Sequence, residues 1–136
     1  MNTTTTNGYA AVAQLLNTYY DGLYHGDLSA LGEVFHPDAS YVTASSRELL
    51  HLNMTSYFAK VEARESPESL GEPYGYTVES IEFAGPTAAL VRMRCSMLGK
   101  HFIDLLSLIN VDGKWRIISK VFHYEVQEQT RSSGGE

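Results

Sequence analysis

Residues 19–31 read YYDGLYHGDLSAL, and residues 35–39 read FHPDA. Together the two stretches predict a helix, a corner at Gly26 and Asp27, a short second helix, and a turn that leads into the first strand. Two helices followed at once by a strand favour a layer of helices packed over a sheet, and such a layer can enclose a pocket.

The first helix is expected over residues 9–24, where apolar side chains recur at helical spacing. Gly26 ends this helix, and Asp27 is well suited to cap a second one over residues 28–35, because its carboxylate can accept hydrogen bonds from the next backbone N–H groups. Pro37 then ends the helical region.

The rest of the chain reads mainly as strands. Asn53 can cap a third helix, whose apolar stripe of Met54, Tyr57, Phe58 and Val61 faces inward. Asp112 and Gly113 predict a tight hairpin turn. The expected strands are residues 39–44, 47–52, 76–83, 88–98, 100–111 and 114–125. Helices followed by consecutive strands predict an α+β fold with helices on one face of an antiparallel sheet.

The length of 136 residues fits one domain over residues 9–126, with a flexible tail at residues 1–8 and a disordered one at residues 127–136. The net charge of −6 and the absence of a basic run argue against a nucleic-acid partner. No segment has the apolar length of a membrane span or the pattern of a signal peptide, so a cytoplasmic location is expected. The single cysteine, Cys95, excludes an internal disulfide and reads as a small buried thiol.

Three motifs carry a resemblance to a known superfamily: the YYDG…GD…L segment from Tyr19, the FHPDA segment, and DLLSL…DGKWRIISK over residues 104–120. Over residues 9–126 the chain resembles the nuclear transport factor 2-like superfamily. It is most similar to the putative lumazine-binding branch, a neighbour of the SnoaL-like, polyketide-cyclase-like proteins. The resemblance implies a cone-shaped α+β fold and a homodimer formed through the outer face of the sheet. The superfamily includes isomerases, dehydratases, cyclases and binding modules, so it implies no single activity.

Laid beside ketosteroid isomerase, a member of the same superfamily, the chain has Tyr19 at the position of the oxyanion-hole tyrosine. Thr43 stands at the position of the general base and Ser107 at that of the hydrogen-bonding Asp. Because a threonine cannot shuttle a proton between carbons at neutral pH, steroid isomerisation is rejected. Counting back from the hairpin turn, Ser107 shares a face with Lys120, and Asp104 lies on the opposite face unless a bulge intervenes.

The same comparison places four side chains on the concave side of the sheet: Leu90, Arg92, Arg94 and Lys120. Three cations facing one cavity predict an anionic or carbonyl-bearing ligand, since unpaired buried charge is costly. The alternative is that Arg92 and Arg94 lie near a sheet edge and pair with Glu79, Glu82 or Asp104.

His36 and Asp38 flank Pro37, and they are either an acid–base pair at the pocket rim or the polar groups of a tight turn. The tyrosines at 19, 41, 57 and 124 are pocket-wall candidates or core. The expected ligand contacts are Tyr19, Tyr41, Met54, Tyr57, Phe58, Arg92, Arg94, Ser107, Lys120 and Tyr124.

The histidines show no metal-ligand spacing, and the chain has no phosphate loop or nucleophile elbow, so neither a metal nor a cofactor is expected. The sequence favours a small-molecule-binding domain whose pocket takes a compact, ring-containing or anionic ligand. One alternative is a cofactor-independent cyclase, dehydratase or isomerase in which Tyr19 acts with His36 or Asp38. The other is a structural dimerisation domain whose own side chains fill the cone.

Overall fold

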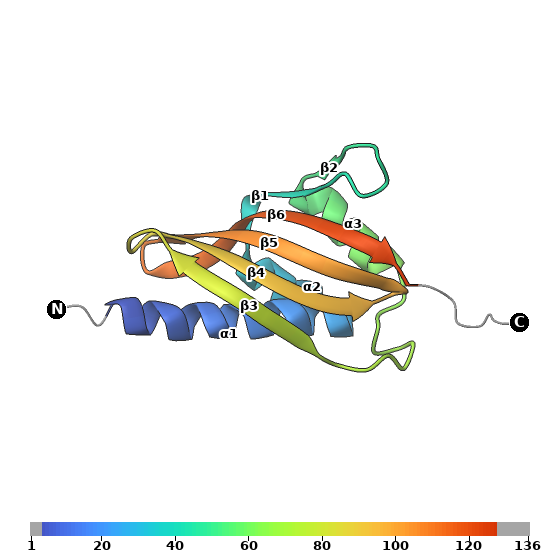
Figure 1. The fold of residues 1–136 in the computed structure, drawn as a ribbon, viewed down its shortest axis with the longest axis horizontal. Coiled ribbons are helices and arrows are strands. Elements are labelled where there is room, and N and C mark those ends of the chain that lie inside the picture. Colours follow the sequence, from blue (N-terminus) through green and yellow to red (C-terminus); the bar gives the residue numbers. More distant parts are fainter. Residues whose placement is uncertain (1–3, 128–136) are drawn as a thin grey trace, which may run out of the picture.

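The computed structural model describes residues 4–127, which form one sheet with three helices on one face (Figure 1). The strand order is β2-β1-β6-β5-β4-β3; β1 and β6 run parallel, and all other neighbours are antiparallel. The predicted α+β class is confirmed. The elements are α1 (Thr4–His25), α2 (Leu28–Val34), β1 (Phe35–Thr43), β2 (Leu50–Leu52), α3 (Met54–Ala63), β3 (Tyr76–Phe83), β4 (Ala88–Met97), β5 (Lys100–Val111) and β6 (Lys114–Val126).

The helix ends follow the capping signals in the sequence. The Asp27 carboxylate accepts hydrogen bonds from the backbone N–H groups of Ser29 and Ala30 at 3.0 and 3.2 Å, and Asn53 caps α3 in the same way. Gly26 links α1 to this cap at a φ of 68°, a conformation that favours glycine. Both predicted caps are confirmed.

The predicted tails differ from the described chain at the N-terminal end. Residues 4–8, predicted to be a flexible tail, belong to α1. Residues 1–3, and residues 128–136 of the predicted C-terminal tail, lie outside the described residues. No helix within residues 4–127 is long and apolar enough to cross a membrane.

The segment around Pro37 is part of β1 rather than a turn before it. Strand β1 pairs with β6 at Phe35 and again from Ser40, and the register shifts between these two points. Proline has no N–H to donate to a regular ladder, and it is tolerated at this position because the pairing between β1 and β6 is irregular there. The strand therefore begins four residues earlier than predicted.

A β-bulge sets which side chains of β6 face the helices. The predicted turn is confirmed: Asp112 and Gly113 both have positive φ, and Val111 pairs with Lys114. Farther from the turn, Ser107 pairs with Ser119 and Leu108 with Ile117, so Ile118 is an extra residue in β6. Asp104 and Lys120 therefore share the inner face, and Ser107 points to the outer one. The opposite assignment, made by counting back from the turn, is wrong because the extra residue inverts every side chain of β6 beyond it.

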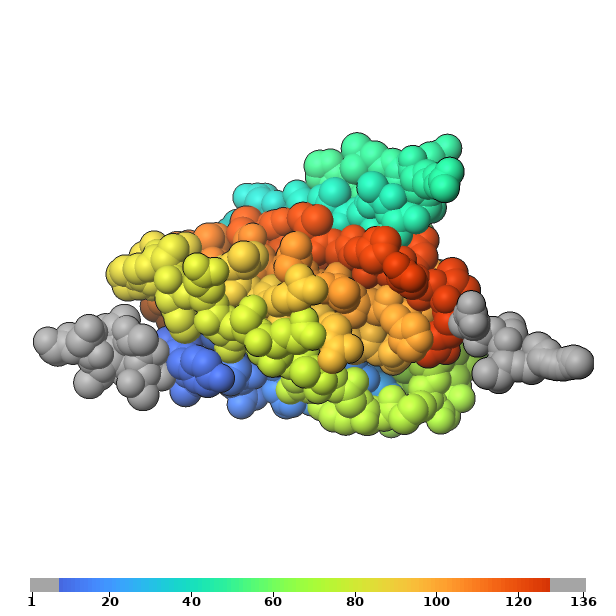
Figure 2. Space-filling view, viewed as in Figure 1, coloured from blue at the N-terminus to red at the C-terminus, as the bar shows by residue number. Residues whose placement is uncertain are grey.

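The outer face of the sheet carries the two arginines of β4. Ala89, Val91 and Met93 are buried against the helices, so the alternating Leu90, Arg92 and Arg94 point outward. The side chains of β3 to β6 form the visible face of the molecule in Figure 2, with no helix over them. The prediction that Leu90, Arg92 and Arg94 lie on the concave side is therefore wrong.

Aromatic rings join the helices to the inner face of the sheet. Tyr57 of α3 stacks on Tyr41 of β1 with ring centroids 4.3 Å apart, and Tyr20 of α1 lies 4.8 Å from Tyr76 of β3. The loop between α3 and β3 is held by hydrogen bonds, since the hydroxyl of Tyr24 donates to the carbonyl of Glu72 at 2.6 Å. Between these contacts the helices and the sheet are not fully packed, and a cavity remains.

Two glycines in the helices should respond oppositely to alanine. A Cβ on Gly22 would lie 2.7 Å from Cδ2 of the fully buried Leu31, whereas one on Gly32 would meet nothing within 4 Å. We expect Gly22→Ala to lower the free energy of unfolding by about 1–3 kcal/mol through overpacking. Gly32→Ala should raise it by about 0.5–1 kcal/mol through helix propensity. Urea unfolding of both variants measures this, and a stabilised Gly22→Ala would show that α1 and α2 do not pack as described.

Candidate functional site

A cavity of about 240 Å³ lies between the concave face of the sheet and the helices. Ten of its sixteen lining residues are apolar or aromatic, and its charged side chains fall into a buried set, Asp104 and Lys120, and a more exposed set, Lys60, Arg64 and Lys100. The lining residues come from α1, α3, four strands of one end of the sheet, and β2: Leu23, Tyr41, Thr43, Leu50, Tyr57, Lys60, Arg64, Cys95, Met97, Leu98, Lys100, Phe102, Asp104, Lys120, Phe122 and Tyr124. A mostly apolar pocket with a few convergent polar groups is the usual form of a small-molecule site.

Asp104 is the acceptor at the buried end of the cavity. Its side chain is 2% exposed, and its Oδ2 accepts a hydrogen bond of 2.6 Å from the hydroxyl of Tyr19. Its Oδ1 has no hydrogen-bond partner among the residues that the structure describes. An unsatisfied buried polar atom costs about 1–3 kcal/mol, so this oxygen is suited to a donor that enters the cavity.

Lys120 places a cation beside this carboxylate, within a cage of aromatic rings. It is 5% exposed, and its Nζ donates to the hydroxyl of Tyr57 at 3.3 Å. The same atom lies 5.1–5.4 Å from the ring centroids of four aromatic residues, a distance at which cation–π attraction operates. These residues are Tyr19, Tyr41, Tyr57 and Phe122.

The site holds its groups in defined protonation states. Burial acts to lower the pKa of Lys120, but Tyr57 and Asp104 outweigh it and hold the pKa above its ordinary value. Lys120 is therefore an ammonium ion at neutral pH. Burial, followed by the nearby Asp104, holds the pKa of Tyr19 well above its ordinary value, so the phenol remains a donor. Burial also raises the pKa of the Cys95 thiol to about 12, which leaves it unreactive as a nucleophile.

The structure brings four of the predicted ligand contacts to this cavity. Tyr41, Tyr57, Lys120 and Tyr124 line it. Tyr19 does not line it, but it contacts two lining residues, through its hydrogen bond to Asp104 and its ring beside Lys120.

Two further predicted contacts, Met54 and Phe58, lie on α3 outside the cavity wall. Met54 is buried and borders a separate hollow beside β1, whereas the ring of Phe58 packs against Phe35 and Tyr57. Neither side chain lines the cavity, although Phe58 packs against Tyr57, which does.

The predicted contacts Arg92, Arg94 and Ser107 lie on the outer face. Both arginines bond the carboxylate of Glu79, with Nε of Arg92 at 2.7 Å from its oxygen, and they lower the pKa of that carboxyl. The alternative weighed from the sequence, pairing with Glu79, is therefore the correct one. The two arginines cannot contribute to an anion site inside the cone.

His36 and Asp38, the predicted catalytic pair, do not reach the cavity either. The backbone N–H of Asp38 donates to Nδ1 of His36 at 3.0 Å, and the Asp38 side chain is 87% exposed. Neither residue belongs to the cavity lining. The geometry therefore argues against the catalytic interpretation, and it also differs from the predicted tight turn, because both residues lie within β1 and the His36 ring accepts from the Asp38 backbone.

Sequence reasoning missed Asp104, Lys60, Arg64 and Lys100 as site residues. Asp104 was not predicted as a site residue because regular pairing between residues 100–111 and 114–125 placed it on the face opposite Lys120. The sequence nevertheless carries a signal for it. A lone carboxylate with apolar neighbours on both sides, as in FIDLL at residues 102–106, is typical of a buried polar site. No comparable signal marks Lys60, Arg64 and Lys100, since exposed cations are common on helix ends and hairpins.

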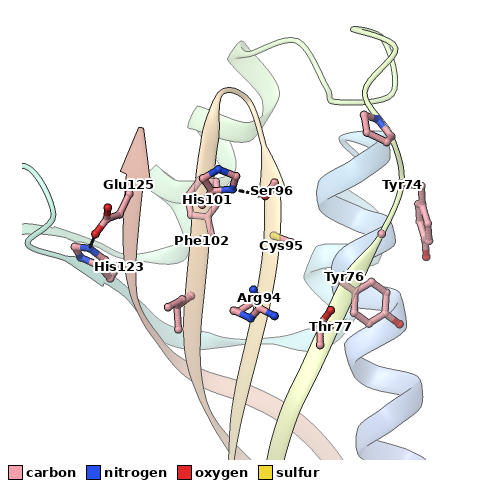
Figure 3. Close-up of a pocket in the computed structure, with 13 residues that line it drawn as sticks. Tyr74, Tyr76, Thr77, Arg94, Cys95, Ser96, His101, Phe102, His123 and Glu125 are labelled. Atoms are coloured by element: carbon pink, nitrogen blue, oxygen red, sulfur yellow. Dashed lines mark hydrogen bonds and ion pairs between the residues drawn. The ribbon is translucent and has the colours of Figure 1, made fainter. Parts of the chain in front are cut away.

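A second, wider hollow of about 700 Å³ lies on the outer face (Figure 3). In this hollow His101 bonds Ser96 at 2.6 Å, and His123 lies 3.2 Å from Glu125. The two histidines of this hollow therefore already bond neighbouring side chains. Within residues 4–127, no three or more His, Cys, Asp or Glu side chains gather closely enough to hold a metal ion.

Residues 7–123 match the family described as Putative lumazine-binding. The chain belongs to this family. It is 28% identical over 121 residues to Aldolase FrzH of a Cladobotryum species, a match that covers 88% of this chain and 93% of that protein. Among solved structures it is similar to an NTF2-like protein of unknown function from Silicibacter pomeroyi. The identity is 28% and the TM-score 0.76, over 92% of this chain and 100% of that one.

A second structural relative is an NTF2-like protein of unknown function from Shewanella baltica. Its identity is 25% and its TM-score 0.80, over 91% of this chain and 98% of that one. The predicted superfamily resemblance and the NTF2-like α+β fold are thereby confirmed. Both solved structures are NTF2-like proteins of unknown function, so they support the fold and leave the activity open.

The raised pKa values at the site predict a loss of stability at alkaline pH. Tyr19 and Lys120 have ordinary pKa values of 10.0 and 10.5, and both are raised in the folded protein. Their contribution to stability is complete below about pH 10 and is lost as the pH rises toward the folded-state values. We expect the free energy of unfolding to fall above about pH 10, with a shallower fall in Tyr19→Phe. Urea unfolding at a series of pH values measures both slopes, and equal slopes would contradict the assignment to Tyr19.

Proposed function

We propose that this protein binds a small carbonyl compound in the cavity and catalyses a cofactor-independent reaction that begins with proton removal next to the carbonyl. The observation that carries the proposal is Oδ1 of Asp104, which has no hydrogen-bond partner within residues 4–127 and is buried near the ammonium of Lys120. A base and a fixed cation in one enclosed pocket are what enolate formation requires.

The reaction follows from the positions of four side chains. The carboxylate of Asp104 removes a proton from the carbon next to the carbonyl, and the C–H electron pair forms the enolate. Negative charge develops on the carbonyl oxygen, where the ammonium of Lys120 and the hydroxyl of Tyr57 stabilise it. Tyr19 holds Asp104 in place through Oδ2, which leaves Oδ1 to act as the base.

An aldol-type step completes this sequence. The enolate carbon attacks a second carbonyl carbon, a C–C bond forms as the C=O π bond breaks, and the resulting alkoxide takes up the proton that Asp104 had removed, which regenerates the carboxylate. The name of one relative, Aldolase FrzH, supports this type of reaction. Lys120 acts here as a cation and not as an amine nucleophile, because Tyr57 and Asp104 keep its pKa raised although burial opposes this.

The alternatives from the sequence fit the cavity less well. Neither His36 nor Asp38 lines the cavity, so Asp104 replaces them as the proposed base. A structural domain filled by its own side chains would leave no cavity, whereas about 240 Å³ is open here. A binding module without chemistry needs no unpartnered carboxylate oxygen at its buried end.

Proton exchange tests the proposal directly. We expect the protein to accelerate deuterium exchange next to the carbonyl of small ketones in D₂O, followed by proton NMR. Asp104→Asn removes the base and should lower the rate by about 10²–10⁴-fold. Acetophenone, 4-phenyl-2-butanone and levulinate are suitable substrates because their exchangeable protons are resolved.

The control is Asp38→Asn, which removes the carboxylate that the sequence suggested as the base and should leave the exchange rate unchanged, since Asp38 is exposed outside the cavity. Circular dichroism checks that Asp104→Asn is folded. Exchange that survives in a folded Asp104→Asn variant would sink the assignment of the base. The absence of exchange above buffer in the wild type, for all three ketones, would sink the proposed reaction.

We also propose a homodimer formed through the outer face of the sheet. Leu90, Leu105 and Val121 are 37–44% exposed there on three adjacent strands, and Leu105 pairs directly with Val121. A large apolar group of this kind on an uncovered sheet is typical of a protein–protein interface.

Substitution within this surface should separate the two copies. We expect Leu105→Glu to convert the dimer to a monomer in sedimentation velocity, because a charge would be buried without a partner. Leu49→Glu is the matched control, since Leu49 is 71% exposed in the turn before β2 and away from the outer face. A monomeric wild type, or a Leu105→Glu variant that remains dimeric, would contradict this interface.

A further inference from the structure

The open end of the cavity carries three positive side chains from separate parts of the chain. Lys60 lies in the last turn of α3, Arg64 follows that helix, and Lys100 begins β5. Lys60 is exposed and the other two are half-buried, whereas Asp104 and Lys120 at the opposite end are buried. The cavity therefore runs from a positive mouth to the proposed reaction centre.

These three cations have no counterion among the residues that the structure describes. The ion pairs found within residues 4–127 involve Glu79 on the outer face and three histidines, and none includes Lys60, Arg64 or Lys100. The Nζ of Lys100 instead lies 4.6 Å from the ring centroid of Tyr124, which lines the cavity. In a chain with 16 acidic residues and a net charge of −6, this concentration of free positive charge runs against the overall charge of the protein.

The charge at the mouth acts on the interior of the cavity. Burial raises the pKa of the Tyr41 hydroxyl, while Lys120 and Arg64 both oppose that rise. Arg64 and Lys120 therefore both add positive electrostatic potential at Tyr41, which lines the cavity. A molecule inside the cavity lies near positive charge from both residues. Between the two ends the wall includes the apolar side chains of Leu50, Met97 and Phe102, which suit a short hydrocarbon body.

We propose that the substrate is a carbonyl compound that also carries a carboxylate or phosphate group. The anionic group binds at the mouth to Lys60, Arg64 and Lys100, and the carbonyl reaches Asp104 and Lys120 at the buried end. The planar guanidinium of Arg64 can bond two oxygens of such a group, and the lysines add charge. This inference rests on the proposed function, because it assigns the substrate class for the same cavity.

One pair of probes isolates the anionic group. Levulinate and methyl levulinate share a carbon skeleton and a methyl ketone, and differ in whether the remote group is a carboxylate. Binding is measured by amide shifts in ¹H–¹⁵N spectra, and exchange of the ketone's neighbouring protons is measured in D₂O on the same protein. The variants are Arg64→Gln and Lys100→Gln. Lys114→Gln, which removes an exposed cation at the β5–β6 hairpin, is the matched control.

We expect levulinate to bind roughly tenfold more tightly than its methyl ester, and each mouth variant to reduce that ratio, because a charge-assisted hydrogen bond is lost. Added salt should reduce the ratio as well, since the mouth is open to solvent. Lys114→Gln should leave the ratio unchanged. Competition by benzoate and by phenyl phosphate then shows whether the mouth prefers a carboxylate or a phosphate.

The outcomes separate this inference from the proposed function. Equal binding of acid and ester, a ratio that Arg64→Gln and Lys100→Gln leave unchanged, or no binding of either probe would overturn the anionic substrate. Preferential binding of levulinate that depends on Arg64, without exchange above buffer, would support the anionic ligand and overturn the proton-transfer chemistry. Exchange of both probes at equal efficiency would leave the chemistry intact and overturn the inference.

Discussion

The β-bulge between β5 and β6 is the constraint on which the interior of this protein depends. One extra residue in β6, Ile118, reverses the inward and outward sides of that strand beyond this point, whereas β5 alternates without interruption. The bulge thereby places Lys120 on the concave face that Asp104 already occupies, where Tyr57 can reach it. With regular pairing Lys120 would lie on the outer face, and the cavity would hold the carboxylate without the cation beside it. A single backbone irregularity thus brings two opposite charges to one face.

The charges that result are costly, and the surrounding residues only partly offset the cost. Removing a carboxylate and an ammonium from water costs several kcal/mol each, of the order known for buried ions. The hydroxyls of Tyr19 and Tyr57 and the ring faces around Lys120 return part of this, but Oδ1 of Asp104 remains without a partner within residues 4–127. A protein that needed only stability would fill this space with hydrocarbon side chains. The buried carboxylate oxygen that lacks a hydrogen-bond partner among the described residues is the feature from which we infer a ligand.

The treatment of positive charge differs on the two faces of the sheet. On the outer face Arg92 and Arg94 share the single carboxylate of Glu79, so one of their two charges is neutralised. At the cavity mouth Lys60, Arg64 and Lys100 lack such a partner among the described residues, although acidic residues outnumber basic ones in the chain by 16 to 10. Arg64 and Lys120 both add positive electrostatic potential inside the cavity. Together with an apolar wall, this arrangement suits an elongated molecule that is anionic at one end and polar at the other.

The sequence by itself determined the class of fold, the helix caps at Asp27 and Asn53, and the hairpin at Asp112 and Gly113. These features depend on local patterns, in which a side chain acts on its own or neighbouring backbone groups. It also indicated Tyr41, Tyr57 and Lys120 as cavity residues. Only the tertiary structure decided the face of Asp104, the outward direction of Arg92 and Arg94, and the distance of His36 from the cavity. The face that Asp104 shares with Lys120 depends on the register between β5 and β6, which a bulge changes without a clear local signal. The other two depend on which faces and segments of the sheet the helices cover.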